Sequence, residues 1–263
     1  MKWNGFKIVK QYKETKDVAL IVYFVLRILV IFCMILQIIN GDLNNAFMCL
    51  FSLILFTIPG FIEKKFKIEL PSLLESIIYI FIFAAEILGS INNFYGNVPH
   101  LDTILHTLNG FLAAGIGFSL VDLLNTKVKN VNLSPFFVTV VAFCFSMTIG
   151  VLWEFGEYGV DVLFDHDSQK DKIVTKVASV KFNPEDKNEA ALIDHIVRTE
   201  IYTEDGKVYL IDGGYLDIGI NDTMKDLIVN FIGAICFSII GYLYIKNRDK
   251  YRFAKNFIPV KNE

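Results

Sequence analysis

The stretch "VALIVYFVLRILVIFCMILQIIN" (residues 18–40) contains one charged residue, Arg27, and neither glycine nor proline. An α-helix rises about 1.5 Å per residue, so about 20 apolar residues cross a hydrocarbon core of roughly 30 Å. This stretch is long enough to do so as one uninterrupted helix. It therefore predicts a transmembrane helix and indicates that the chain is an integral membrane protein.

Five further apolar stretches of similar length follow in the sequence. The six expected spans are residues 18–40, 45–62, 72–91, 101–124, 135–157 and 223–245. The chain of 263 residues is 54% hydrophobic, with a mean hydropathy of +0.47, which is too apolar for an ordinary soluble domain. Because lipid cannot satisfy backbone polar groups, the predicted fold class is an all-α membrane bundle of about six transmembrane helices.

Charge and cysteine usage exclude several classes of function. A net charge of −3 and a pI near 5.9 argue against a nucleic-acid partner. The four cysteines lie inside apolar segments without a CxxC pair, which favours small core residues over a disulfide framework or a cysteine metal site. No cleavable signal peptide is predicted, because the first apolar stretch is too long for one.

Lysine and arginine gather in alternate connecting segments, which predicts the orientation of the bundle. The basic segments are residues 1–17, 63–67, 127–129 and 246–261, whereas 40–45 and 90–102 contain neither residue type. The expected protein is a multi-pass protein of the plasma membrane with cytoplasmic N- and C-termini. Residues 158–222 then lie outside.

The predicted organisation has three parts: residues 1–164, an extracytoplasmic insertion at 165–221, and 222–263. From 165 to 222 the chain holds thirteen acidic and seven basic residues, so this segment is solvated. Alternating residues around Asp205-Gly206 predict a β-hairpin over 198–212. A further strand is expected within 172–182 and a short helix over 188–198, giving a small α/β insertion.

Polar side chains recur at helical spacing near the predicted outer ends of four spans. "GVLWEFGEYGVD" (150–161) places three carboxylates on one stripe, and comparable stripes lie on the spans before and after it. These candidate residues are Glu86, Asp102, His106, Asn109, Glu154, Glu157, Asp161, Asp222, Asp226 and Asn230. Because a lone carboxylate in hydrocarbon is unfavourable by a few kcal/mol, the side chains are expected to face a shared polar cavity in the outer leaflet.

A purely structural interpretation stays open for most of these residues, including His106, Glu154 and Asp226. Asp102, Asp161 and Asp222 are close enough to the boundary to reach interfacial water, and Asp222 also suits a helix N-cap. Asn109 and Asn230 suit hydrogen bonds between helices. Four small residues are expected at close helix contacts: Gly110, Ala113, Ala114 and Gly117.

The leading functional hypothesis is a metal-dependent membrane enzyme, although the sequence leaves open whether the protein is an enzyme. His106, Glu154 and Asp226 are the expected ligands of a divalent metal ion (Zn²⁺, Mn²⁺ or Mg²⁺). Asp102 and Glu157 are the expected catalytic carboxylates, Asp102 by orienting His106 or acting as a base. The site lies at headgroup depth, so the expected partners are membrane lipids, and the expected substrate is an envelope lipid or lipid-linked headgroup.

Two other classes of function fit the same residues. An ion-coupled transporter or proton relay also uses intramembrane acids and a histidine, with Arg27 and Glu86 as further elements of a path. Alternatively, the acidic insertion docks an extracytoplasmic partner and the protein is a membrane scaffold.

Three short motifs on successive spans carry a resemblance to known families. "DTILH" (102–106), "WEFGE" (153–157) and "DTMKDLIVNFIGA" (222–234) resemble the bacterial YjdF-like membrane proteins, and their order is also similar to the VanZ-like family. The resemblance covers about half of the chain. It implies an integral protein of the bacterial envelope, and it implies roles for Asp102, His106, Glu154, Asp226 and Asn230. Members of the VanZ-like family are associated with resistance to glycopeptide antibiotics.

Overall fold

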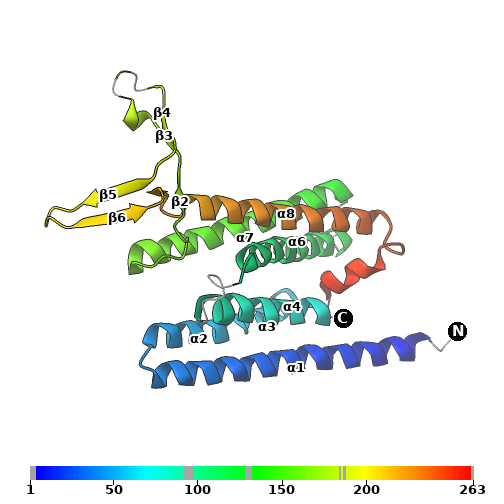
Figure 1. Ribbon diagram of the computed structural model, residues 1–263. Coiled ribbons are helices and arrows are strands. Elements are labelled where there is room, and N and C mark those ends of the chain that lie inside the picture. The colour runs from blue at the N-terminus through cyan, green and yellow to red at the C-terminus, as the bar shows by residue number, and fades with distance from the viewer. Residues whose placement is uncertain (1–3, 92–97, 128–131, 184, 186–187, 262–263) are drawn as a thin grey trace. The chain divides into compact units, whose positions relative to one another are not determined.

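The computed structural model describes residues 4–91, 98–127, 132–183, 185 and 188–261. Within this part of the chain, six helices are long and apolar enough to cross a membrane (Figure 1). They are Val18–Ile39, Leu43–Phe66, Ser72–Gly89, Leu101–Asn125, Pro135–Phe164 and Ile220–Lys246. The prediction of a helical membrane bundle with about six spans is confirmed.

The helical elements follow one another with short connections, except before the last span. They are α1 (Asn4–Ile39), α2 (Leu43–Leu55), α3 (Ile58–Phe66), α4 (Ser72–Phe83), the π-helix η1 (Ala84–Ile91), α6 (Leu101–Lys127), α7 (Pro135–Phe164), the short 3₁₀-helix η2 (Val180–Phe182) in the insertion, α8 (Ile220–Lys246) and the 3₁₀-helix η3 (Arg252–Phe257). A strand pair, β1 (Ile68–Glu69) with β8 (Val260–Lys261), ties the C-terminal segment to the segment between α3 and α4.

The second span consists of two helices rather than one. The helix α2 ends at Leu55, and α3 begins at Ile58 with Pro59 in its first turn. In a continuous helix, the ring of Pro59 would clash with the carbonyl of Leu55, four residues earlier. The proline therefore interrupts the span predicted over 45–62, although the apolar stretch as a whole still reaches from Leu43 to Phe66.

The third span changes its helical type halfway. It begins after Pro71 as the α-helix α4, as expected for a proline at a helix start, and continues as the π-helix η1. π-Helical turns are uncommon and frequently occur at functional sites. Glu86, one of the candidate residues, lies in this π-helical segment.

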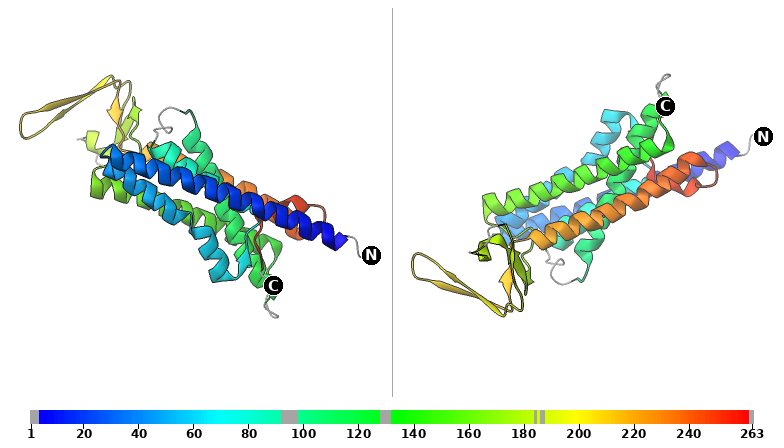
Figure 2. Two further views of the ribbon diagram at one scale, coloured as in Figure 1. Left: turned by 90° about the horizontal axis from the view of Figure 1, so that it is seen from below. Right: turned by 90° about the horizontal axis from the view of Figure 1, so that it is seen from above.

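The described chain divides into two compact units, one of residues 1–150 with 227–263 and one of residues 151–226. In the first unit, α1 packs against α2 and α4 (Figure 2), around buried residues that include Val30, Phe56 and Tyr79. A second apolar core joins α6, the first part of α7, and α8 around Phe118 and Phe237.

The second unit contains the strands of the insertion. Three antiparallel pairs form: β2 (Ile173–Val174) with β7 (Tyr215–Leu216), β3 (Val177–Ser179) with β4 (Ala191–Ile193), and β5 (Arg198–Tyr202) with β6 (Val208–Asp212). The hairpin predicted around Gly206, which has a positive φ of 82°, is confirmed. The helix predicted over 188–198 is wrong, because Ala191–Ile193 pairs with β3 and Arg198 begins β5.

Candidate metal centre

Helices α6 and α8 cross with their backbones in contact. A Cβ atom added to Gly110 would lie 2.0 Å from the backbone oxygen of Asn230, and one added to Gly233 would lie 2.0 Å from the backbone oxygen of Thr107. No side chain fits at either position. The close packing predicted for Gly110 is therefore confirmed, and Gly233 contributes an equivalent contact that the sequence reasoning missed.

Asn230 of α8 contacts both α6 and α7 at this crossing, and its Nδ2 atom lies 3.7 Å from Sδ of Met147 on α7. It is 1% exposed, and its Oδ1 atom accepts a hydrogen bond of 3.1 Å from Nδ2 of Asn109. Ser146 of α7 donates a hydrogen bond of 2.7 Å to the backbone oxygen of Gly110. The interpretation of Asn109 and Asn230 as hydrogen-bonding partners between helices is thus supported, because they bond to each other directly.

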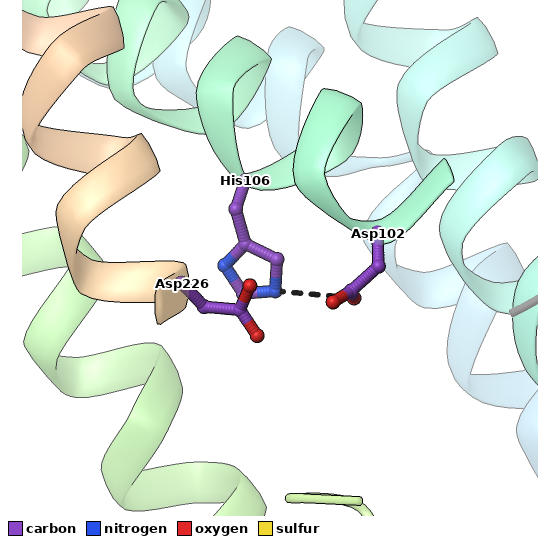
Figure 3. Close-up of side chains that lie close together, drawn as sticks. All are labelled: Asp102, His106 and Asp226. Carbon is purple, nitrogen blue, oxygen red and sulfur yellow. Dashed lines mark ion pairs between the residues drawn. The ribbon is translucent and has the colours of Figure 1, made fainter. Parts of the chain in front are cut away.

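One helical turn before this crossing, three potential metal ligands converge. Asp102 and His106 come from α6, and Asp226 comes from α8, four residues before Asn230 on the same unbroken helix. One ligand atom from each residue lies within 4.8 Å of the other two (Figure 3). His106 Nε2 lies 3.7 Å from Asp102 Oδ1, and the Asp226 side chain is 2% exposed. A nitrogen and two carboxylate oxygens at this spacing suit a divalent cation.

The group differs in one member from the ligands expected from the sequence. Among the described residues it contains Asp102 together with His106 and Asp226, and it does not include Glu154. Glu154 lies on α7 and is 5% exposed. Glu157, one turn further along α7, accepts a hydrogen bond of 2.8 Å from Trp153 Nε1 and interacts electrostatically with Glu154, Lys170 and Asp226.

Two other candidate carboxylates have structural partners in the second unit. Asp161 accepts hydrogen bonds from the backbone amides of Ser168 (2.6 Å) and Gln169 (2.9 Å), which fastens the loop that follows α7. Asp222 lies 3.0 Å from the ammonium group of Lys172. Both carboxylates therefore stabilise the loop that follows α7 and its contact with the beginning of α8.

Glu86 lies in the first unit and is not a member of the metal-ligand group. Its side chain is 4% exposed, and its Oε2 atom has no hydrogen-bond partner among the described residues. Burying a carboxyl group in a membrane is energetically unfavourable, so such residues are rare and usually have a function or a partner. Glu86 therefore keeps its place as a candidate functional residue.

Asp217, which the sequence reasoning missed, caps the beginning of α8. Its carboxylate accepts hydrogen bonds from the backbone amides of Lys172 (2.7 Å), Gly219 (3.2 Å) and Asn221 (3.0 Å), and from the Asn221 side chain. The sequence signal was an aspartate shortly before a glycine and a helix start. This cap, rather than Asp222, satisfies the first amides of the helix, which begins at Ile220.

We expect Asp217→Ala to lower stability by about 1 kcal/mol, the usual effect of losing a helix cap. Burial alone raises the pKa of the Asp217 carboxyl, but the hydrogen bonds lower it further, so the pKa lies below its ordinary value. The stabilisation is therefore present above about pH 4 and is lost as the pH falls below it. Hydrogen exchange of the Gly219 and Asn221 amides measures this. Asp212→Ala, which removes a carboxylate that is 77% exposed, should leave these amides protected.

Comparison with known proteins places the chain in a family. Residues 21–247 match a family model described as "Predicted membrane protein (DUF2238)". No curated protein and no solved structure matches the chain. The match supports the YjdF-like resemblance, whereas the VanZ-like resemblance stays a prediction. The match spans most of the chain and agrees with its six apolar helices, so this multi-pass membrane protein belongs to the DUF2238 family.

Proposed function

We propose that this protein is a metal-dependent membrane enzyme that acts on the headgroup of an envelope lipid or of a lipid-linked substrate. The observation that carries this proposal is the convergence of Asp102, His106 and Asp226, whose ligand atoms lie within 4.8 Å of one another. Two carboxylates and one imidazole leave coordination positions for water or substrate, as catalytic metal sites require. The imidazole favours Zn²⁺ or Mn²⁺ over Mg²⁺.

The depth of the group supports a headgroup substrate. Asp102 is the second residue of α6, and Asp226 is the seventh of α8, so the group lies within about 10 Å of the helix starts. With the orientation predicted from the basic loops, both helices start at the outer surface. Lipid headgroups occupy this depth, and a substrate there needs no path through the membrane.

The residues around the group suggest how the reaction would proceed. A bound divalent cation supplies a Lewis acid that polarises a substrate oxygen or lowers the pKa of a coordinated water. Glu157 interacts electrostatically with Asp226 and is held by Trp153, so it is positioned to accept a proton at its carboxylate. Asp102, whose Oδ1 atom lies 3.7 Å from Nε2 of His106, would join that imidazole as a ligand of the cation.

Metal content per chain tests the proposal. We expect the purified protein to hold about one Zn²⁺ or Mn²⁺ per chain, and His106→Ala to lower the metal affinity at least about 100-fold, since it removes one of three protein ligands. His166→Ala is the matched control, because His166 is an exposed histidine and should leave the metal content unchanged. Wild-type protein without metal after incubation with either cation, or equal loss in both variants, would contradict the proposal.

Glu86 favours a second candidate function, an ion-coupled transporter. A buried carboxylate oxygen without a hydrogen-bond partner among the described residues is the kind of group that carries protons in membranes. If the protein is a relay, liposomes containing it should show proton or cation flux that Glu86→Gln and Asp226→Asn abolish. Flux that persists in both variants, or no flux in the wild type, would contradict a relay through these two carboxylates.

A further inference from the structure

In the part of the insertion that the structure describes, the hairpin of β5 and β6 has no third strand. The two strands pair only with each other, and they project from the other strand pairs of the insertion (Figure 1). A sheet of two strands is only marginally stable in water, and each of its outer edges carries unpaired N–H and C=O groups. The hairpin therefore offers edges to which a further strand can be added.

The register of the hairpin shows which backbone groups of β6 lie at its outer edge. The amide of Gly213 donates to the oxygen of Val197 (2.9 Å), and the amide of Thr203 donates to the oxygen of Lys207 (3.0 Å). Residues along an antiparallel strand alternate between those bonded to the partner strand and those facing away from it. The odd-numbered residues of β6 therefore bond to β5, and the backbone groups of its even-numbered residues, with Leu210 at their centre, face outward.

The outer edge of β6 lacks the features that usually prevent the addition of a strand. Sheet edges are commonly protected by lysine, proline or a β-bulge, but β6 contains neither residue and pairs with β5 in an uninterrupted register. Val208, Tyr209 and Leu210 are 48%, 54% and 56% exposed. In β5, by contrast, the outward-facing positions include the charged residues Arg198 and Glu200. The edge of β6 is thus the one that suits a further strand.

Charge indicates which kind of molecule fits this edge. The hairpin over residues 198–212 carries four acidic and two basic residues, and the segment 165–222 carries thirteen and seven. A second copy of the insertion would bring like charges together, whereas a basic segment is attracted. Lipid is a poor alternative, because it cannot satisfy the backbone groups of the edge. Charge complementarity therefore favours a basic polypeptide.

The two faces of the hairpin differ in polarity. Residues directly opposite each other share a face, so Ile201 and Tyr209 lie together on the first face. The second face holds Glu200 and Asp212, together with Arg198, which lies 3.1 Å from the Asp212 carboxylate. An added strand with alternating apolar and basic residues would place its apolar side chains on the first face and its basic side chains on the second.

We propose that the outer edge of β6 binds an extended segment of another protein, in which apolar and basic residues alternate. The segment adds a third strand to the hairpin. Hydrogen bonds between the backbones supply affinity, and the alternating side chains supply specificity. With the orientation predicted from the basic loops, this partner lies outside the membrane. The interaction does not depend on the metal centre and goes beyond the proposed enzyme activity.

A fluorescent peptide of Val-Lys repeats, titrated against the full chain in phosphatidylcholine nanodiscs, tests this proposal. Fluorescence anisotropy measures the affinity, and empty nanodiscs give the background. We expect a peptide of Val-Glu repeats to bind at least about tenfold more weakly, because its charges are repelled. Two further Val-Lys peptides carry N-methyl groups on all valines or on all lysines. Only one of these two should lose its binding, because a strand turns alternate N–H groups toward one edge.

Leu210→Pro removes an outward N–H group from β6 and leaves the bonds to β5 in place. We expect this variant to lower the affinity for the Val-Lys peptide at least about tenfold. Tyr202→Pro is the matched control, because it removes an outward N–H group from the edge of β5, and it should change the affinity less than about threefold. Hydrogen exchange of the Ile201 and Tyr209 amides, which face the interior of the hairpin, checks that both variants keep the strand pair.

Several results would overturn the proposal. They are an absence of peptide binding above that of empty nanodiscs, equal affinities of the two N-methylated peptides, and equal affinities of Leu210→Pro and Tyr202→Pro. If the wild type is a dimer that only Leu210→Pro converts to a monomer, the edge belongs to a second copy of the chain. If a membrane-impermeant thiol reagent labels Tyr209→Cys in detergent but not in nanodiscs, the hairpin lies in lipid. Either of these results also refutes the proposed partner.

Discussion

Gly110→Ala is expected to destabilise the protein by about 3 kcal/mol, at the upper end of the usual range for overpacking. The added Cβ would lie 2.0 Å from the backbone oxygen of Asn230, so α6 and α8 must move apart. A flexible side chain could move aside, but a helix backbone cannot do so without breaking its packing. The separation would also pull Asp226 away from His106, so metal affinity should fall together with stability. Reversible unfolding in bicelles measures the free energy, and metal analysis measures the second effect.

Gly156→Ala on α7 is the matched control for this prediction. A Cβ atom added to Gly156 meets no atom within 4 Å, so the change introduces no clash. Alanine also favours a helix over glycine by up to about 1 kcal/mol, so this variant should be equally stable or slightly more stable than the wild type. If both variants behave alike, the close contact between α6 and α8 does not exist as described.

Arg248→Ala is expected to destabilise the protein by about 3 kcal/mol, because it removes the guanidinium group that pairs with the largely buried carboxylate of Asp122. The Nη2 atom of Arg248 lies 2.7 Å and 2.9 Å from the two carboxylate oxygens of Asp122. The Asp122 side chain is 10% exposed, and the guanidinium group also lies over the ring of Tyr244, 5.0 Å from its centroid. This ion pair joins the ends of α6 and α8 that are remote from the metal centre.

Because this ion pair is remote from the metal centre, its loss is expected to change the stability of the protein but not its metal binding. Arg248→Ala should lower stability while the metal content of the folded protein stays unchanged. Asp122→Asn with Arg248→Ala should recover part of the loss, because the negative charge that Arg248 balanced is removed as well. Arg252→Ala breaks an exposed ion pair with Asp249 and should change stability by less than about 1 kcal/mol. A similar loss in Arg252→Ala would show that burial of Asp122 is not the cause.

The six spans could be predicted from the sequence because each depends on local composition alone. About 20 consecutive apolar residues leave the chain few alternatives to a membrane helix. The hairpin over 198–212 could also be predicted from the sequence, because its turn residues and its alternation of apolar and polar residues are local features. The break at Pro59 and the strand at Ala191–Ile193 were missed for different reasons. The first is a local effect of a proline inside the span predicted over 45–62, whereas the second depends on pairing with the distant residues Val177–Ser179.

For the candidate site, the sequence by itself determined that acidic and imidazole side chains recur at helical spacing near one end of several spans. Helical periodicity places Asp102 and His106 on one face, and Asp226 and Asn230 on another, without any knowledge of packing. Only the tertiary structure decided that these two faces meet, and that Asp102 joins His106 and Asp226 within 4.8 Å. The physical reason is that two helices pack through the faces on which their backbones can approach most closely. Here Gly110 and Gly233 allow that close approach.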